Sequence, residues 1–191
     1  MIWECVVTTL AADGHVHIAP MGVHEDDRHV IVAPFRPSGT LTNLERDGNA
    51  VINYTDDARI IAGCLTGRVD WPLLPATRIR GSRLADCLAH TEVTLDRVEP
   101  DELRPRLYCR RVHAEQHAPF RGFNRAQAAV VEAAILVSRL HMLPWGKIET
   151  EIAYLKIAVD KTAGPREREA WTWLMERIEE HRQNPVPQRH T

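Results

Sequence analysis

The sequence predicts an α+β protein in which a small β-barrel over residues 1–120 precedes a three-helix segment over residues 121–183. Short segments rich in Val, Ile and Thr recur in the first part and are separated by turn residues, as is typical of strands. About seven such strands, interrupted by one short helix, favour a closed or half-open barrel because closure protects strand edges. From Asn124 the apolar residues instead recur with the period of helices, and residues 184–191 are expected to form a frayed tail.

A β-hairpin is expected at the start of the chain. Residues 2–10 are rich in Val and Thr, an Asp-Gly pair favours a tight turn, and residues 15–21 form the returning strand. On that second strand His15 and His17 share one face. Two neighbouring histidines can bind a metal, but no third ligand follows at a suitable spacing, so a polar strand face is the preferred interpretation.

The next feature, residues 30–48, is a strand followed by a turn and a short helix. The strand is β-branched, two prolines end it, Ser38 or Thr40 can cap the helix, and Gly48 supplies the stop. The first turn of a helix has free backbone N–H groups, so two hydroxyls and the guanidinium of Arg36 complete a set of donors that suits a phosphate. An ordinary capped helix beside a surface arginine is the alternative interpretation.

The rest of the first part reads as strands and loops. Residues 71–75 contain two prolines, which argues against a central strand, so we expect a loop that can cover a pocket. The remaining strands are predicted at residues 50–54, 60–65, 90–98 and 106–115.

The helical segment is expected to begin at Asn124, which can cap a helix over residues 126–140. Gln127 then occupies the position of a capping-box partner. This helix is apolar on nearly every side and should be largely buried. A second helix ends at Gly164, and a third begins at Pro165.

Three charged residues recur every seven positions in the apolar helix and therefore lie on one stripe. They are Arg125, Glu132 and Arg139. A solvated stripe is the simplest interpretation. A buried ion network at a helix or subunit contact is the alternative, because the surrounding face is so apolar.

Composition excludes several classes of function. A net charge of -2 and a pI near 6.5 give no general attraction to nucleic acid or to an anionic membrane. The 4 cysteines are scattered without paired spacing, which suggests neither a zinc site nor a disulfide framework and fits a reducing compartment. The N-terminus lacks the features of a signal peptide, and no apolar run is long enough to span a bilayer. We therefore expect a soluble cytoplasmic protein.

Several motifs, in the right order, resemble a known family. The segments VTT, HIAPMG, APFRPSGTLTNL and FNRAQAAVVEAAILVSRL resemble the DUF447 family of proteins of unknown function. That family belongs to the FMN-binding split-barrel superfamily, together with pyridoxine-phosphate oxidases and flavin reductases. It occurs in archaea and in bacteria that carry methanopterin-linked one-carbon genes.

The resemblance implies a split barrel that binds FMN at the interface of a homodimer and acts as an oxidoreductase on an unknown substrate, linked to methanopterin-dependent one-carbon metabolism. The family's phosphate-binding turn falls on the donor set already described. A non-catalytic flavin carrier or redox sensor is the alternative, since no catalytic acid or base is identified and no metal is expected. The implied cofactor-binding residues are Arg36, Ser38, Gly39, Thr40, Asn43, His17, Pro20, Met21 and Asn53.

The apolar helix over residues 126–140 bears on assembly. It must be covered on several sides, and the split-barrel resemblance places a second subunit against the barrel. We therefore expect an obligate symmetric dimer with an apolar interface.

Overall fold

The computed structural model describes residues 1–184, which form two compact units. The first unit consists of residues 1–56 and 70–120, and the second of residues 57–69 together with the described residues from 121 onward. The predicted tail lies outside the described residues except for Asn184. Among the described helices, none combines the length and the apolar character that crossing a membrane requires.

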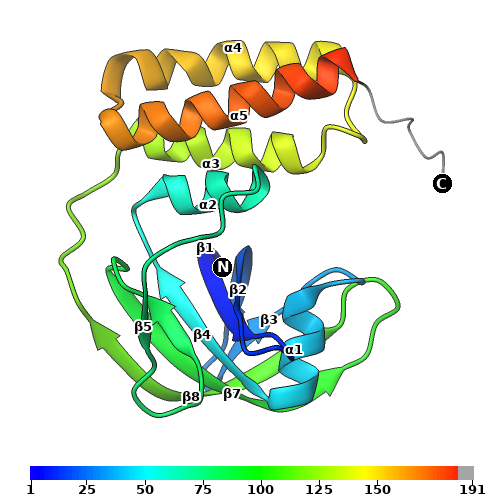
Figure 1. The fold of residues 1–191 in the computed structure, drawn as a ribbon, viewed down its shortest axis with the longest axis vertical. Coiled ribbons are helices and arrows are strands. Elements are labelled where there is room, and N and C mark those ends of the chain that lie inside the picture. The colour runs from blue at the N-terminus through cyan, green and yellow to red at the C-terminus, as the bar shows by residue number, and fades with distance from the viewer. Residues whose placement is uncertain (185–191) are drawn as a thin grey trace. The chain divides into compact units, whose positions relative to one another are not determined.

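The first unit is a barrel. In the described part of the chain, six strands close it in the order β1-β2-β3-β8-β7-β4, and every neighbouring pair is antiparallel (Figure 1). The predicted hairpin, the predicted barrel and all but one of its strands are thereby confirmed. The strands are β1 (Ile2–Leu10), β2 (Val16–Glu25), β3 (His29–Val32), β4 (Asn49–Tyr54), β7 (Ala89–Glu99) and β8 (Arg106–Gln116).

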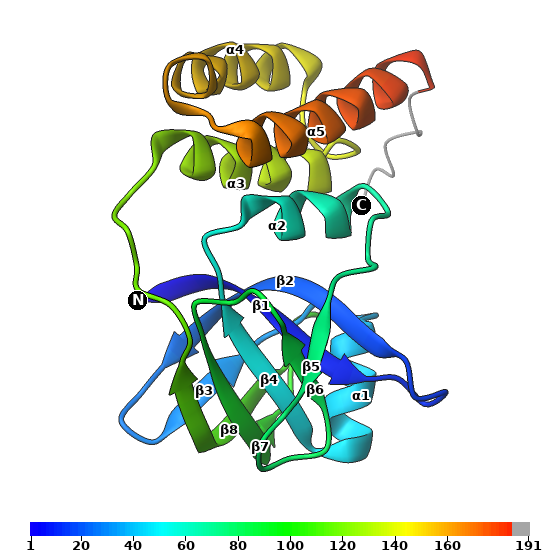
Figure 2. The same ribbon diagram turned by 60° about the vertical axis from the view of Figure 1, so that its left-hand side comes forward.

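Alternation along the strands separates the inner face of the barrel from the outer face. Val7 and Ile52 lie opposite each other on β1 and β4 and belong to the buried core. Helix α1 (Gly39–Asp47) lies beside the strands and adds Leu41 and Leu44 to the same core (Figure 2). This packing fixes the position of α1, and with it the turn that precedes the helix.

The ends of α1 follow the local sequence pattern. Ser38 is the N-cap, with an extended backbone (φ -148°, ψ 132°), so of the two predicted caps Ser38 rather than Thr40 takes the role. Gly48 ends the helix in the left-handed region (φ 70°), and its N–H donates to the carbonyl of Leu44 at 2.9 Å.

One predicted strand is a helix. Residues 60–65 belong to α2 (Ala58–Leu65), which lies in the second unit and contacts its other helices. The side chain of Asp57 accepts the backbone N–H of Arg59 and caps this helix. A short apolar run does not distinguish a strand from a buried helix by its period alone, and packing against the other helices decides the outcome here.

The expected loop at residues 71–75 contains a short strand. β5 (Leu73–Pro75) pairs with β6 (Ser82–Leu84) in a separate two-stranded sheet. Thr8 donates its hydroxyl to the carbonyl of Ser82 at 2.6 Å, which fastens β6 to the outer face of β1. The segment lies outside the barrel, as its prolines predict, but part of it forms a strand in a separate sheet.

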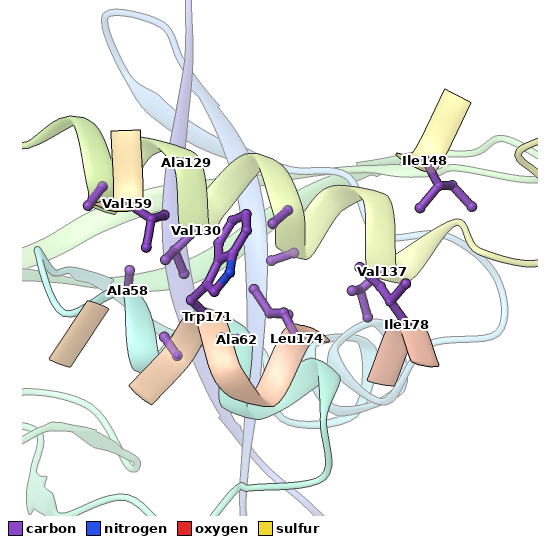
Figure 3. Packing of buried hydrophobic residues seen from close by; sticks show 14 of the residues in the cluster. Ala58, Ala62, Ala129, Val130, Val137, Ile148, Val159, Trp171, Leu174 and Ile178 are labelled. Atoms are coloured by element: carbon purple, nitrogen blue, oxygen red, sulfur yellow. The ribbon is translucent and has the colours of Figure 1, made fainter. Parts of the chain in front are cut away.

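The second unit packs α2 with α3 (Arg125–Ser138), α4 (Trp145–Thr162) and α5 (Pro165–Gln183). Its three C-terminal helices confirm the predicted helical segment. Figure 3 shows Trp171 and Leu174 of α5 among the small side chains of α2 and α3, such as Ala62 and Ala129. Small residues let the helices approach closely, and the large side chains of α5 fill the space between them.

Two details of α3 refine the prediction. Asn124 caps it by accepting the N–H groups of Ala126 and Gln127 at 2.8 and 3.3 Å. The side chain of Gln127 instead donates to Glu167 at 3.2 Å, so the predicted capping box does not form. The charged stripe is solvated in this chain, as its three members are all exposed: Arg125, Glu132 and Arg139.

Candidate functional site

The turn before α1 presents free hydrogen-bond donors. Backbone N–H groups in the first turn of a helix have no acceptor within the helix. Ser38 satisfies only one of them, because its Oγ accepts the N–H of Leu41 at a long 3.4 Å. The N–H groups of Gly39 and Thr40 thus lie at the positive end of the helix dipole, which favours an anion.

Thr40 is the most informative residue of this turn. Its side chain is fully buried (0% exposed), and its Oγ1 has no hydrogen-bond partner among the described residues. A buried hydroxyl without a partner costs about 1–3 kcal/mol. Such a group in a native fold calls for an explanation, and a ligand that hydrogen-bonds to it at the start of α1 is one.

His17 of β2 lies against this turn. A methyl group on Gly39 would lie 3.1 Å from both Cε1 and Nε2 of His17, so the bare glycine permits the close approach. Burial lowers the pKa of His17, which favours the neutral imidazole. Two segments predicted separately, the second strand and the phosphate turn, therefore meet at one place.

Arg36 is held by a neighbour instead of by the turn itself. Its guanidinium lies 3.6 Å from the carboxylate of Glu45 on α1, and the side chains are 44% and 41% exposed. Its backbone N–H donates to the carbonyl of Leu103 at 2.9 Å, which fixes the chain at this point. An exposed ion pair of this kind contributes about 0–1 kcal/mol, so the guanidinium can turn to an anion at little cost.

Asn43 has a structural contact. It is buried, its Nδ2 donates to the hydroxyl of Thr9 at 3.0 Å, and its Oδ1 accepts from Arg46 at 3.4 Å. The bond to Thr9 fastens α1 to β1 and so supports the phosphate turn from behind.

Pro20 and Met21 follow each other on β2 and so point to opposite faces. Met21 shares a face with His17 and packs against the barrel core, opposite Cys5. Pro20 lies opposite Val6 on the other face. Of these two predicted ring contacts, only Met21 lies on the side of the strand that carries His17.

Asn53 is engaged elsewhere. It is fully buried, and its Nδ2 donates to the carbonyl of Val6 at 3.0 Å and to the hydroxyl of Thr8 at 3.2 Å. Its Oδ1 accepts the N–H of Leu84 at 2.8 Å. Asn53 thus holds β6 on the barrel, on the outer face and apart from the contacts of the phosphate turn.

A cavity of about 500 Å³ lies on the outer face of the barrel, along β2, β3 and β8. The Trp71 to Pro75 segment, expected to cover a pocket, contributes none of its lining. Arg104 lies at its wall, where its Nε donates to the carbonyl of Ala33 at 2.7 Å. Its lining residues are His24, Ile31, Ala33, Glu99, Pro100, Asp101, Arg104, Arg106 and Tyr108.

A second group of polar side chains was missed by the sequence analysis. On β7, His90 and Glu92 are buried, and on β8 His113, Glu115 and the following His117 alternate with other residues. The signal was the alternation His-x-Glu-x-His in a predicted strand. The sequence alone does not predict this group, because it does not show which residues of β7 pair with these residues of β8.

The thiols offer no nucleophile. Burial raises the pKa of Cys109 to about 12 and that of Cys64 to about 11. Because only the thiolate is an effective nucleophile, cysteine chemistry at neutral pH is disfavoured at both positions.

Comparison with known proteins follows the same two parts of the chain. The profile of the N-terminal domain of the protein family of unknown function DUF447 matches residues 3–118. A second DUF447 profile matches residues 124–176. A search among curated proteins finds no significant match.

Solved structures share the fold. An FMN-bound DUF447 protein from Methanosarcina mazei is 17% identical with a TM-score of 0.78, over 92% of this chain and 94% of that one. The 2-nitrobenzoate 2-nitroreductase of Pseudomonas fluorescens is 21% identical with a TM-score of 0.53, over 60% of this chain and 64% of that one. An FMN-binding protein from Thermus thermophilus is 13% identical with a TM-score of 0.51, over 59% and 69%. The predicted split barrel with C-terminal helices is confirmed as the fold.

Proposed function

The chain belongs to the DUF447 family, and from that premise we propose that it binds FMN and acts as a flavin-dependent oxidoreductase. The observation that carries the proposal is the buried hydroxyl of Thr40 at the start of α1, which has no hydrogen-bond partner within the described part of the chain. The fold supports it, since the DUF447 protein from Methanosarcina mazei was solved with FMN bound. The same turn is the one that the sequence pattern predicts to hold a phosphate.

In this proposal the phosphate of FMN is held by the turn. Ser38 and Thr40 offer hydroxyls, Gly39 and Thr40 offer backbone N–H groups, and Arg36 offers a guanidinium that now pairs with the exposed carboxylate of Glu45. Charge-assisted hydrogen bonds and the helix dipole both favour a dianionic phosphate there. Asn43 serves by anchoring α1 and not as a donor to the ligand.

The flavin ring is assigned to the part of β2 around His17, beside the turn. Met21 is left out of this assignment because it packs against the barrel core. The neutral imidazole of His17 adjoins Gly39 and can form a hydrogen bond with a ligand held at the turn. Asn53 is left out of this assignment because its hydrogen-bonding groups are already used. When bound, FMN supplies the electron-transfer chemistry, and these side chains bind and orient it.

The cofactor test is a titration of the purified, cofactor-free protein with FMN and with riboflavin. We expect FMN to bind with its flavin absorption perturbed and riboflavin, which lacks the phosphate, to bind much more weakly. Protein that takes up neither flavin would overturn the proposal.

The oxidoreductase part is tested on the FMN-loaded protein. We expect NADH or NADPH to reduce the bound flavin, and candidate acceptors, including one-carbon carriers of the methanopterin type, to reoxidise it with turnover. A bound flavin that no such donor reduces would leave the non-catalytic carrier as the function.

We also propose that the protein works as a cytoplasmic homodimer with FMN at the subunit interface. A cofactor that binds across an interface stabilises the dimer by linkage. Sedimentation across a dilution series should show a dimer that dissociates at lower protein concentration when FMN is present than when it is absent. A folded monomer with full FMN affinity at high dilution would contradict this assembly.

A further inference from the structure

The two long strands of the barrel carry an array of metal-ligating side chains that FMN binding does not use. His113, Glu115 and His117 alternate along β8 and its end, so they share one face. On β7, His90 lies directly opposite Glu115, and Glu92 lies opposite His113. The register of the two strands thus gathers three histidines and two carboxylates.

Three of these side chains converge. One ring nitrogen of His90, one of His113 and a carboxylate oxygen of Glu115 all lie within 4.8 Å of one another. The Nε2 atom of His113 is buried and has no hydrogen-bond partner among the described residues, and a Glu115 oxygen lies 3.5 Å from it. A buried imidazole nitrogen beside a carboxylate, with no donor or acceptor of its own, is an incomplete arrangement unless a further group occupies the space between them.

Glu92 sets the orientation of His90. The carboxylate of Glu92 accepts the backbone N–H groups of residues 77–79 at 2.5, 2.7 and 3.0 Å, so its oxygens act as hydrogen-bond acceptors. An ionised carboxylate only accepts hydrogen bonds, so His90 donates Nε2–H to it at 3.2 Å and keeps its lone pair on Nδ1. Ligating histidines commonly have such a carboxylate behind them, because it fixes the tautomer and raises the basicity of the ring.

The Nδ1 atom of His90 lies 2.8 Å from Nε2 of His117, so one proton bridges the two rings. A metal ion that binds Nδ1 of His90 takes the place of this hydrogen bond, and His117, which is only half-buried, keeps the bridging proton and moves aside.

We propose that His90, His113 and Glu115 form a binding site for a divalent transition metal of the Zn²⁺ type, with Glu92 as the carboxylate that orients His90. Two imidazoles and a carboxylate are ligands that Zn²⁺ accepts, and three protein ligands leave one position open for water or substrate. The proposal differs from the sequence-based expectation of no metal, which weighed the cysteines and the pair His15 and His17.

The experiment uses full-length protein that has been treated with a chelator and carries no affinity tag. Zn²⁺ is titrated in competition with a chromogenic chelator, and Co²⁺ is added separately to follow the visible absorption of the bound ion. We expect one equivalent of Zn²⁺ per chain and a Co²⁺ spectrum characteristic of nitrogen and oxygen ligands. Absence of stoichiometric binding would overturn the proposal.

Two ligand variants and one control place the ion. His113→Ala and Glu115→Gln, both on the more accessible strand, should each lower Zn²⁺ affinity by at least about 10-fold, the effect typical of losing even an outer partner of a metal. His15→Ala, which removes an exposed histidine paired with Asp13, should bind as wild type does. Circular dichroism and FMN affinity serve as checks that the variants fold. Ligand variants that bind Zn²⁺ as tightly as the control would assign the ion to another place and sink the idea.

Discussion

Backbone N–H groups face an anion at several places in the barrel unit, and two of these places differ in where the anion comes from. At residues 77–79, three successive N–H groups donate to the carboxylate of Glu92 at 2.5, 2.7 and 3.0 Å. The first turn of α1 contains no acidic residue, and the hydroxyl of Thr40 has no hydrogen-bond partner among residues 1–184. We call the N–H groups of residues 77–79 the filled cradle and those of the first turn of α1 the open cradle. Donors that bind the chain's own carboxylate stabilise the fold, whereas donors left open are suited to a ligand.

The largest loss of stability is expected from removing the carboxylate of Glu92 from the filled cradle. Glu92→Ala leaves three backbone N–H groups and His90 without an acceptor in a buried place. We expect the free energy of unfolding to fall by about 3–5 kcal/mol, the range for breaking a buried charged contact. Urea unfolding measures it. A loss below about 1 kcal/mol would mean that water replaces the carboxylate and that the two cradles are alike.

The contact between Glu92 and the N–H groups of residues 77–79 should stabilise the fold at neutral pH and lose this effect in acid. The pKa of Glu92 lies below the ordinary value of 4.5 in the folded protein, so the unfolded chain takes up a proton at a higher pH than the folded one does. The stabilisation is therefore fully present above about 4.5, the unfolded pKa, and is lost as pH falls through the folded pKa. In Glu92→Gln this acid-dependent part of the unfolding free energy should be missing.

A smaller effect, a loss of FMN affinity, is expected from removing Arg36 beside the open cradle. Arg36→Ala should weaken FMN binding by about 2 kcal/mol because it removes a charge-assisted contact to phosphate. Riboflavin affinity and urea stability should change little, since the arginine's present ion pair with Glu45 is exposed. An equal loss for riboflavin would place Arg36 in folding or in ring binding instead.

Thr40→Val is the sharpest comparison of the two cradles. Valine keeps the shape of the side chain and removes the hydroxyl, which has no hydrogen-bond partner in the described structure. Without FMN the variant should be as stable as wild type or about 1 kcal/mol more stable, while its FMN affinity falls by about 1 kcal/mol. Opposite signs for folding and binding are what a ligand site predicts. A variant that loses stability without FMN would show that the hydroxyl is satisfied within the fold.

The sequence predicted the open cradle better than the filled one, for a physical reason. Ser38 and Gly48 act within a few residues of their own positions, so local capping rules suffice to find them. Glu92 acts on a loop that precedes it by a strand and a turn, and Asn53 acts on Leu84, so their roles depend on tertiary contacts. Local pattern cannot distinguish such a polar residue from a ligand contact.

The same limit explains the mistaken strand at residues 60–65. Its apolar run fits either structure, and the partners that make it a helix lie in α3 and α5, far along the chain. The histidine array on β7 and β8 was missed because its members meet only through the pairing of His90 with Glu115. Elements defined by local period were found, and groups assembled by register were not.

The smallest effect on FMN affinity is expected at Glu45, which forms the ion pair with Arg36. Glu45→Gln removes the carboxylate 3.6 Å from the guanidinium, so the arginine no longer has to leave a partner to reach phosphate. It also removes a negative charge near a site proposed for a dianion. FMN should therefore bind more tightly by about 0.5 kcal/mol, with the gain shrinking at high salt, while the unfolding free energy falls by no more than that amount.

Parallel titrations of Glu45→Gln and of the double variant with Arg36→Ala decide the cause. The part of the gain that comes from freeing Arg36 should disappear when the arginine is absent, and only the smaller, salt-sensitive part that comes from the charge of Glu45 should remain; a gain that persists in full would mean that the carboxylate acts on the phosphate through its charge alone, without Arg36.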